Sequence, residues 1–127
     1  MEKETYIQSF DGTRLFLKTN FPAKPKAIII IVHGLCEHLG RYEYMTQKLT
    51  GGNFGVYRFD HRGHGKSDGK PVFYNDFNEM IDDVHFVVEL AKKEYPSLSI
   101  FLLGHSMGGF AVTTFGIKYP KAVNIPF

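Results

Sequence analysis

Apolar and polar residues alternate near the N-terminus in a pattern that predicts two strands. The two segments, residues 4–8 and 14–20, flank Asp11-Gly12, a dipeptide typical of the turn in a β-hairpin. Further on, residues 27–32 are an unbroken run of aliphatic side chains, which is typical of a strand covered on both faces. We therefore expect an antiparallel pair followed by a strand in the middle of a sheet.

Helical and strand patterns alternate along the rest of the chain. The longest helical pattern places one apolar stripe along residues 77–91 and ends at Pro96. The expected members of this stripe are Phe77, Met80, Ile81, Val84, Val87, Val88 and Ala91. The other predicted segments are a helix at 41–50 with Tyr42, Met45 and Leu49 on its apolar face, strands at 55–59 and 99–103, and a helix at 107–119. This order predicts an α/β fold with a mixed, mostly parallel sheet and helices on both faces.

Length and composition indicate a single folded domain. The 127 residues suit one domain, and a hydrophobic content of 43% excludes a disordered chain. The 15 basic and 13 acidic residues leave a net charge of +2, which is too small to favour a nucleic-acid partner. The longest aliphatic run is far shorter than the ~20 residues of a transmembrane helix, and the N-terminus lacks the apolar stretch of a secretory signal. We therefore expect a cytoplasmic protein with no nucleic-acid partner and no transmembrane segment.

A G-x-S-x-G motif, Gly104-His105-Ser106-Met107-Gly108, stands between a predicted strand and a predicted helix. A serine hydroxyl becomes a good nucleophile only when a base takes its proton, so it must be exposed where base and substrate both reach it. Glycines at 104 and 108 leave room for the sharp turn that exposes the serine. Ser106 is therefore the candidate nucleophile, and the Met107 N–H, at the start of the helix, is a candidate donor to a developing oxyanion.

A second loop predicts the other half of the oxyanion site. It follows the aliphatic strand and reads His33-Gly34-Leu35-Cys36-Glu37-His38. The second donor of such a site comes from the loop after an earlier central strand, and the Leu35 N–H is our candidate. His33 and Gly34 belong to the same oxyanion loop, and we expect Cys36 to be a small buried side chain.

Three ordered motifs make the chain similar to the α/β-hydrolases, and within them to the monoacylglycerol lipase and lysophospholipase-like branch, also described as the serine aminopeptidase S33 type. The motifs are residues 33–42 (HGLCEHLGRY), residues 60–69 (DHRGHGKSDG) and residues 102–109 (LLGHSMGG). The resemblance covers almost the whole chain. It implies an α/β-hydrolase fold.

The resemblance also implies a reaction and a substrate. It implies that Ser106 attacks a carboxylic ester to form an acyl-enzyme and that the N–H groups of Leu35 and Met107 form the oxyanion hole. The implied substrate is a small lipid ester, a monoacylglycerol or a lysophospholipid, and no cofactor is required. Residues 60–69 are expected to shape the loop beside the active site.

The chain departs from this family after Ser106. A triad on this fold has the order Ser, Asp or Glu, His, yet residues 107–127 contain no Asp, Glu or His. We therefore interpret residues 1–127 as the N-terminal portion of a single α/β-hydrolase domain, truncated after the nucleophile helix. The alternative hypothesis is a catalytically incomplete fragment that acts as a binding or self-associating module, because the strand at 99–103 would keep an unpaired, apolar edge.

The histidines also allow two other interpretations, a different catalytic base and a metal site. His105 adjoins the candidate nucleophile, and the loop histidines are expected near the same end of the sheet, but the resemblance assigns none of them as the base. These loop histidines are His33, His38, His61 and His64. The spacing of the loop histidines and Cys36 differs from the paired motifs of structural zinc sites. We expect no metal and interpret the loop histidines as hydrogen-bonding residues.

Overall fold

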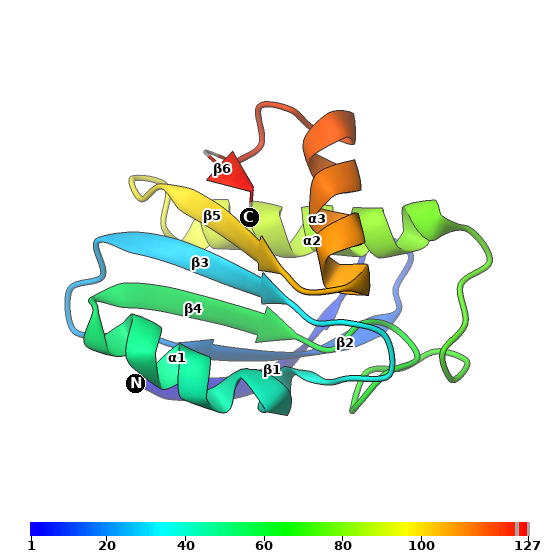
Figure 1. Ribbon diagram of the computed structural model, residues 1–127, viewed down its shortest axis with the longest axis horizontal. Helices are drawn as coiled ribbons and strands as arrows, with labels where there is room; N and C mark the ends of the chain where they lie inside the picture. Colours follow the sequence, from blue (N-terminus) through cyan, green and yellow to red (C-terminus); the bar gives the residue numbers. More distant parts are fainter. Residues whose placement is uncertain (124, 127) are drawn as a thin grey trace.

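The computed structural model describes residues 1–123 and 125–126, and in this part of the chain a six-stranded sheet runs through the molecule (Figure 1). Its strands are β1 (Glu2–Gln8), β2 (Arg14–Asn20), β3 (Ala27–Val32), β4 (Phe54–Phe59), β5 (Ile100–Gly104) and β6 (Ile125–Pro126). The helical segments are η1 (Leu39–Tyr42), α1 (Glu43–Gly51), α2 (Phe77–Glu94) and α3 (Met107–Lys118). The spatial order of the strands is β1-β2-β4-β3-β5-β6, so the aliphatic strand β3 lies inside the sheet, as predicted.

The directions of the strands make the sheet mixed. The β1–β2 and β2–β4 pairs are antiparallel, whereas β4, β3, β5 and β6 run parallel to one another. In the middle of the sheet, Ile30 lies opposite Tyr57 on one side and Leu102 on the other. Parallel strands bring their carboxyl ends to the same edge of the sheet, so the loops after β3, β4 and β5 meet there (Figure 1). The prediction of a mixed, mostly parallel sheet is confirmed.

Helices cover both faces of the sheet (Figure 1). All 6 residues of β3 are buried, because successive side chains of a strand point to opposite faces and both faces are covered here. Ile28 and Ile30 pack with the apolar stripes of α2 and α3, while Ile29 and Ile31 pack with residues of η1 and α1. Within the described residues, no helix is both long and apolar enough to cross a bilayer.

Two predicted helical faces differ from the observed ones. The segment at 41–50 opens with the short 3-10 helix η1, and this changes which side chains of α1 face the sheet. Met45 is 38% exposed, whereas Thr46 is buried and donates a hydrogen bond from its hydroxyl to the Tyr42 carbonyl. Phe77 is 62% exposed and leaves the apolar stripe of α2, because it is the first residue of that helix and lines a surface pocket instead.

The outer side of β5 also differs from the prediction. The sequence predicts an unpaired apolar edge at 99–103, but Phe101 pairs with Ile125 and Leu102 pairs with Pro126 of β6. The chain returns after α3 and brings β6 alongside β5 (Figure 1). The prediction of an unpaired edge is therefore wrong at these positions.

A buried ion cluster ties the turn between β1 and β2 to the rest of the molecule. The Arg62 guanidinium donates to the Asp83 carboxylate of α2 at 2.8 and 2.9 Å, and to the Asp11 carboxylate of the turn at 2.8 and 3.1 Å. The Ser9 hydroxyl also donates to Asp83, at 2.6 Å. Asp83 is completely buried and Arg62 nearly so, which means that water cannot replace a lost partner. Arg62 belongs to the motif at 60–69 and Asp11 to the predicted turn, but the sequence does not show that they pair with each other and with Asp83.

Removing one member of this cluster should cost more stability than removing a surface ion pair. We expect Asp83→Asn to lower the free energy of unfolding by about 3 kcal/mol, because the buried Arg62 loses the one carboxylate partner that is itself completely buried. Lys118→Ala, which breaks the partly exposed pair between Lys118 and Asp82, should cost less than about 1 kcal/mol. Urea denaturation measures both losses. Equal losses would contradict the role assigned to the cluster.

Candidate active site

Ser106 stands at a sharp turn between β5 and α3. Its φ of +57° and ψ of −118° lie outside the regions that residues other than glycine usually adopt. The residue is exposed, and none of the residues in the described part of the chain makes a hydrogen bond to its hydroxyl. The turn therefore holds an unpaired hydroxyl at the carboxyl end of β5, in a strained conformation typical of functional sites.

Gly104 and Gly108 let the backbone of α3 come very close to the sheet. A Cβ on Gly104 would lie 2.3 Å from the Gly108 carbonyl oxygen, and a Cβ on Gly108 would lie 2.0 Å from the Val32 carbonyl oxygen. No side chain fits at such distances in a close-packed interior. The neighbouring Gly109 has room, because the nearest atom to its Cβ would be 3.6 Å away. The requirement for glycine at 104 and 108 thus comes from contact with neighbouring backbone.

The loop after β3 lies against this turn. A Cβ on Gly34 would be 3.3 Å from the Cβ of Ser106. The Gly34 N–H is occupied, since it donates to Glu37 Oε1 at 2.7 Å. Within residues 1–123, the N–H groups of Leu35 and Met107 donate no hydrogen bond to the protein. Both remain available to a ligand that reaches Ser106.

The Glu37 carboxylate holds the loop in this shape. Its Oε1 accepts hydrogen bonds from the Gly34 N–H and from the Tyr42 hydroxyl, each at 2.7 Å, and its Oε2 lies 2.9 Å from the Arg41 guanidinium. The hydrogen bond from Tyr42 lowers the pKa of Glu37, so the group is a carboxylate at neutral pH. Glu37 is part of the first motif, but its place in the sequence does not reveal which N–H group it binds.

Three buried histidines pack together next to the loop. The ring centroids of His33 and His61 are 4.3 Å apart, and those of His33 and His64 are 5.3 Å apart. The His61 N–H donates to His33 Nε2 at 2.9 Å, which assigns the proton of His33 to Nδ1, where it is donated to the Gly34 carbonyl at 2.7 Å. Burial lowers the pKa of His33 to about 4 and the pKa of His61 well below its usual value. Both rings are therefore neutral at pH 7, and they act as hydrogen-bonding residues of the loops.

Asp60 organises the third loop, residues 60–69. Its Oδ1 accepts the Leu39 N–H at 2.7 Å, and its Oδ2 accepts the Lys66 N–H at 2.9 Å. Gly65 has a φ of +49°, and a Cβ there would lie 2.3 Å from Asp60 Oδ2. The buried Asp60 carboxylate thus links the loop after β3 to the loop at 60–69.

An apolar pocket of about 740 Å³ opens beside Ser106. The loop after β3, the segment 72–77 and the first turn of α3 form its walls. Its lining residues are Leu35, Val72, Phe73, Tyr74, Phe77, Ser106, Met107 and Phe110. The Phe77 and Phe110 rings are 5.8 Å apart and form one side of it. No motif in the sequence predicts the wall at 72–77, although the apolar run at 72–74, inside a loop, is a visible signal for it.

The other candidate side chains do not reach the Ser106 hydroxyl. His105 is the next residue, but its side chain is 65% exposed and lies 3.7 Å from Glu37 Oε1. Cys36 is exposed and has a φ of +58°, so the prediction of a buried cysteine is wrong, because the loop turns back toward solvent at this position. Within the described residues, no group of three or more His, Cys, Asp or Glu side chains is arranged to hold a metal ion.

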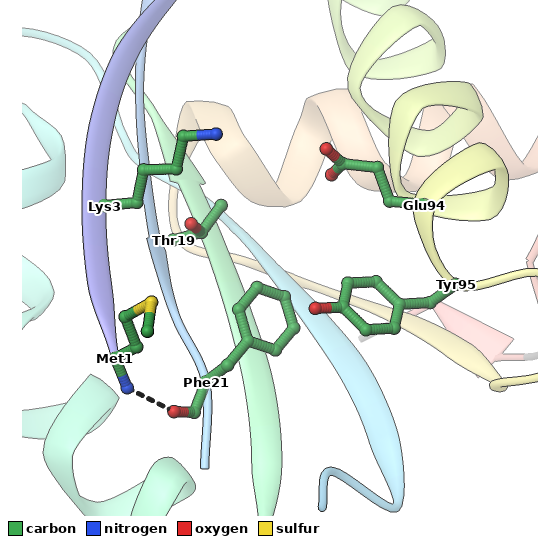
Figure 2. A pocket seen from close by; sticks show the side chains of 6 residues that line it. All are labelled: Met1, Lys3, Thr19, Phe21, Glu94 and Tyr95. Carbon is green, nitrogen blue, oxygen red and sulfur yellow. Dashed lines mark hydrogen bonds between the residues drawn. The ribbon is translucent and has the colours of Figure 1, made fainter. Parts of the chain in front are cut away.

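A second hollow lies at the opposite end of the sheet, near the end of α2 (Figure 2). It measures about 320 Å³, and the side chains of Lys3 and Glu94 point into it from β1 and α2. The rings of Phe21 and Tyr95 stack 4.8 Å apart at one side. We take the pocket beside Ser106 as the candidate active site, because it joins an exposed hydroxyl to two unpaired backbone N–H groups.

The sheet, the strained serine turn and the adjacent loop define an α/β-hydrolase. The family described as "Serine aminopeptidase, S33" matches residues 23–125, and the chain belongs to this family. The family and the fold that the sequence motifs imply are therefore confirmed.

Individual relatives agree with this family. The chain is 41% identical over 96 residues to a monoacylglycerol lipase of Mycolicibacterium smegmatis, across 76% of this chain and 34% of the relative. It is 43% identical over 105 residues to the monoglyceride lipase of Homo sapiens, across 82% of this chain and 35% of the relative. Among solved structures, a carboxyl esterase from Bacillus coagulans superposes with a TM-score of 0.88 at 29% identity, covering 98% of this chain and 43% of the esterase. The chain thus spans about a third of the length of these lipase relatives.

Two adjacent glycines of α3 should respond in opposite ways to alanine. We expect Gly108→Ala to lower the free energy of unfolding by about 3 kcal/mol, because the new Cβ must displace the Val32 carbonyl. Gly109→Ala should raise it by about 0.5–1 kcal/mol, because alanine favours the helix and has room. Thermal and urea denaturation of the two variants test this contrast, and a stable Gly108→Ala protein would contradict it.

Acidification should weaken the fold through the buried histidines. An unfolded histidine titrates near pH 6.5, whereas the folded protein lowers the pKa of His33 to about 4. As the pH falls, His33 takes up a proton in the unfolded state before it does so in the folded state. The stability of the folded protein therefore decreases as the pH falls from about 6.5 to about 4. We expect His33 to contribute a loss of about 3 kcal/mol over this interval, measured by urea denaturation at several pH values.

The matched control for this effect is His33→Gln, which does not titrate. Its stability should fall less steeply over the same pH interval, although it is less stable at pH 7. The same pH dependence in the variant and in the native protein would rule out His33 as the cause.

Proposed function

We propose that this chain carries the nucleophile half of a serine hydrolase that cleaves carboxylic esters of small lipids. The observation that carries the proposal is the exposed, strained Ser106, which lines an apolar pocket together with Leu35 and Met107, whose N–H groups donate no hydrogen bond within the described residues. The lipase and esterase names of its relatives support the same class of reaction.

In the proposed reaction Ser106 Oγ attacks the ester carbonyl carbon. A base takes the hydroxyl proton, and the carbonyl oxygen becomes an oxyanion that accepts hydrogen bonds from the Leu35 and Met107 N–H groups. These donors are held in place before the reaction, since the Gly34 N–H is bound to Glu37 and α3 begins at Met107. As the tetrahedral intermediate collapses, the protonated base gives its proton to the departing oxygen, which leaves as the alcohol, and an acyl-Ser106 ester remains. Water then hydrolyses this ester to the carboxylic acid and free Ser106.

The proposed substrate is a monoacylglycerol or a lysophospholipid. Apolar side chains dominate the pocket beside Ser106, and its volume of about 740 Å³ suits an aliphatic acyl chain. Two relatives are named monoacylglycerol lipase and monoglyceride lipase, and the superposed esterase is in complex with glycerol. A lipid ester with a single acyl chain and a small polar head group fits both the apolar pocket and the names of the relatives. We also propose a cytoplasmic location for the protein. Ester hydrolysis of this kind needs no cofactor.

The base and the acid that orients it are proposed to lie outside these 127 residues. No Asp, Glu or His follows Ser106 in the sequence, and the chain spans about a third of its lipase relatives. We therefore propose that residues 1–127 are the N-terminal portion of a single α/β-hydrolase domain.

A non-catalytic binding or self-associating module is the second candidate. The same lack of Asp, Glu and His after Ser106 favours it. The edge of β5 supports self-association less than the sequence suggested, because β6 occupies part of that edge.

Reaction with a fluorophosphonate should distinguish the two candidates. The probe reacts with a serine that a base activates, so the sample is the complete protein, which under this proposal includes the base and the acid. We expect intact mass spectrometry to detect one adduct on this protein and none on its Ser106→Ala variant. Ser97→Ala, which changes an exposed serine at the other end of the sheet, should keep the adduct. An adduct that persists in Ser106→Ala would refute the assigned nucleophile, and a complete protein without an adduct would favour the non-catalytic module.

A further inference from the structure

Backbone strain in this protein is concentrated around the pocket beside Ser106. Four residues other than glycine have a positive φ in the described part of the chain, namely Cys36, Asn53, Val72 and Ser106. Asn53 follows α1 and needs no special explanation, because asparagine tolerates this conformation well. Val72 and Ser106 line the pocket, and Cys36 follows the lining residue Leu35. Strain of this kind persists only where the surrounding structure enforces it.

Val72 is the most unusual of these residues. Its φ is +48°, and a β-branched side chain makes the left-handed conformation especially unfavourable. The structure enforces the conformation through the adjoining loop, since the Val72 N–H donates to the Gly63 carbonyl at 3.0 Å. Gly63 itself has a φ of +74°, and a Cβ there would lie 2.3 Å from the Lys70 carbonyl oxygen. The backbone at 72 is thus fixed by contacts that do not involve the valine side chain.

Core packing does not explain why this position carries valine. Val72 is 48% exposed and belongs to neither of the two core clusters. Glycine or asparagine at 72 would adopt the same backbone conformation with little or no strain. What the valine side chain adds is an aliphatic surface on the wall of the pocket, on the same segment as Phe73 and Phe77.

We propose that Val72 is a specificity-determining residue, held by its left-handed backbone as a wall of the pocket, and that it limits the length of the acyl chain the pocket accepts. The proposal rests on the proposed function, because it takes the aliphatic chain of a lipid ester as the occupant. It concerns binding of that chain and does not require the hydrolytic step.

The strained backbone is tested by comparing two small residues at position 72. At an ordinary loop position alanine stabilises a protein relative to glycine, because glycine gains more freedom on unfolding. At a left-handed position the order reverses, so Val72→Gly should melt about 2–4 °C above Val72→Ala. A higher melting temperature for Val72→Ala would overturn the claim that the backbone at 72 is strained.

The specificity role is tested with alkylglycerol ethers, which carry an aliphatic chain but cannot be hydrolysed. Calorimetric titration of the native chain with hexyl to dodecyl ethers should give an affinity that rises about fourfold per methylene and then levels off. Val72→Gly should move the levelling point to chains about two methylenes longer, because it empties the space of an isopropyl group, and Val72→Phe should move it to shorter chains. Ile117→Ala, which removes an exposed aliphatic side chain at the far end of α3, should leave the profile unchanged.

The outcomes separate this proposal from the catalytic one. An unchanged profile in Val72→Gly and Val72→Phe would overturn the specificity role, and so would a native chain that binds no ether. If the native chain binds the ethers with the expected profile but the complete protein gives no fluorophosphonate adduct, the role of Val72 stands and the result counts against the proposed catalysis.

Discussion

The close approach of α3 to the backbone of β3 and β5 is the constraint on which the site depends. Gly104 and Gly108 allow it, because any side chain at either position would overlap a carbonyl group of the neighbouring backbone. Because α3 must start so close to the end of β5, the chain changes direction at the single residue Ser106, and this explains the positive φ of that residue. The Met107 N–H, which donates no hydrogen bond within the described residues, stands at the start of α3, where the helix dipole favours a developing negative charge.

Buried polar side chains bind the backbone of the loops around the serine, and apolar side chains of the same region line the pocket. Glu37 binds the Gly34 N–H, Asp60 binds two backbone N–H groups, and Arg62 joins α2 to the first turn of the chain. These charged and buried contacts are strong because little water competes with them. These contacts hold the loops in the conformation that presents the donors and the apolar pocket before any ligand binds.

The periodicity of apolar residues and the positions of glycine and proline predict β2 and β3 with the bounds that the structure shows. They predict the bounds of the other main elements to within a few residues. The errors have a common origin. Thr46 rather than Met45 is the buried residue of α1, which follows directly on η1, and Phe77, the first residue of α2, lines the pocket instead of the core. The free edge predicted for β5 is partly covered by β6. Each error concerns the direction of a side chain or the pairing of a strand, which depends on contacts between distant segments.

By itself, the sequence determined the family, the strand and helix order and the candidate nucleophile, because glycine spacing and short motifs express local backbone requirements. Only the tertiary structure decided which N–H groups stay unpaired, since Glu37 takes one donor and leaves that of Leu35. It also decided the ion cluster of Arg62 and the strained backbone of Val72. These features arise where loops far apart in the chain meet at the carboxyl ends of parallel strands, and no local pattern encodes such a meeting.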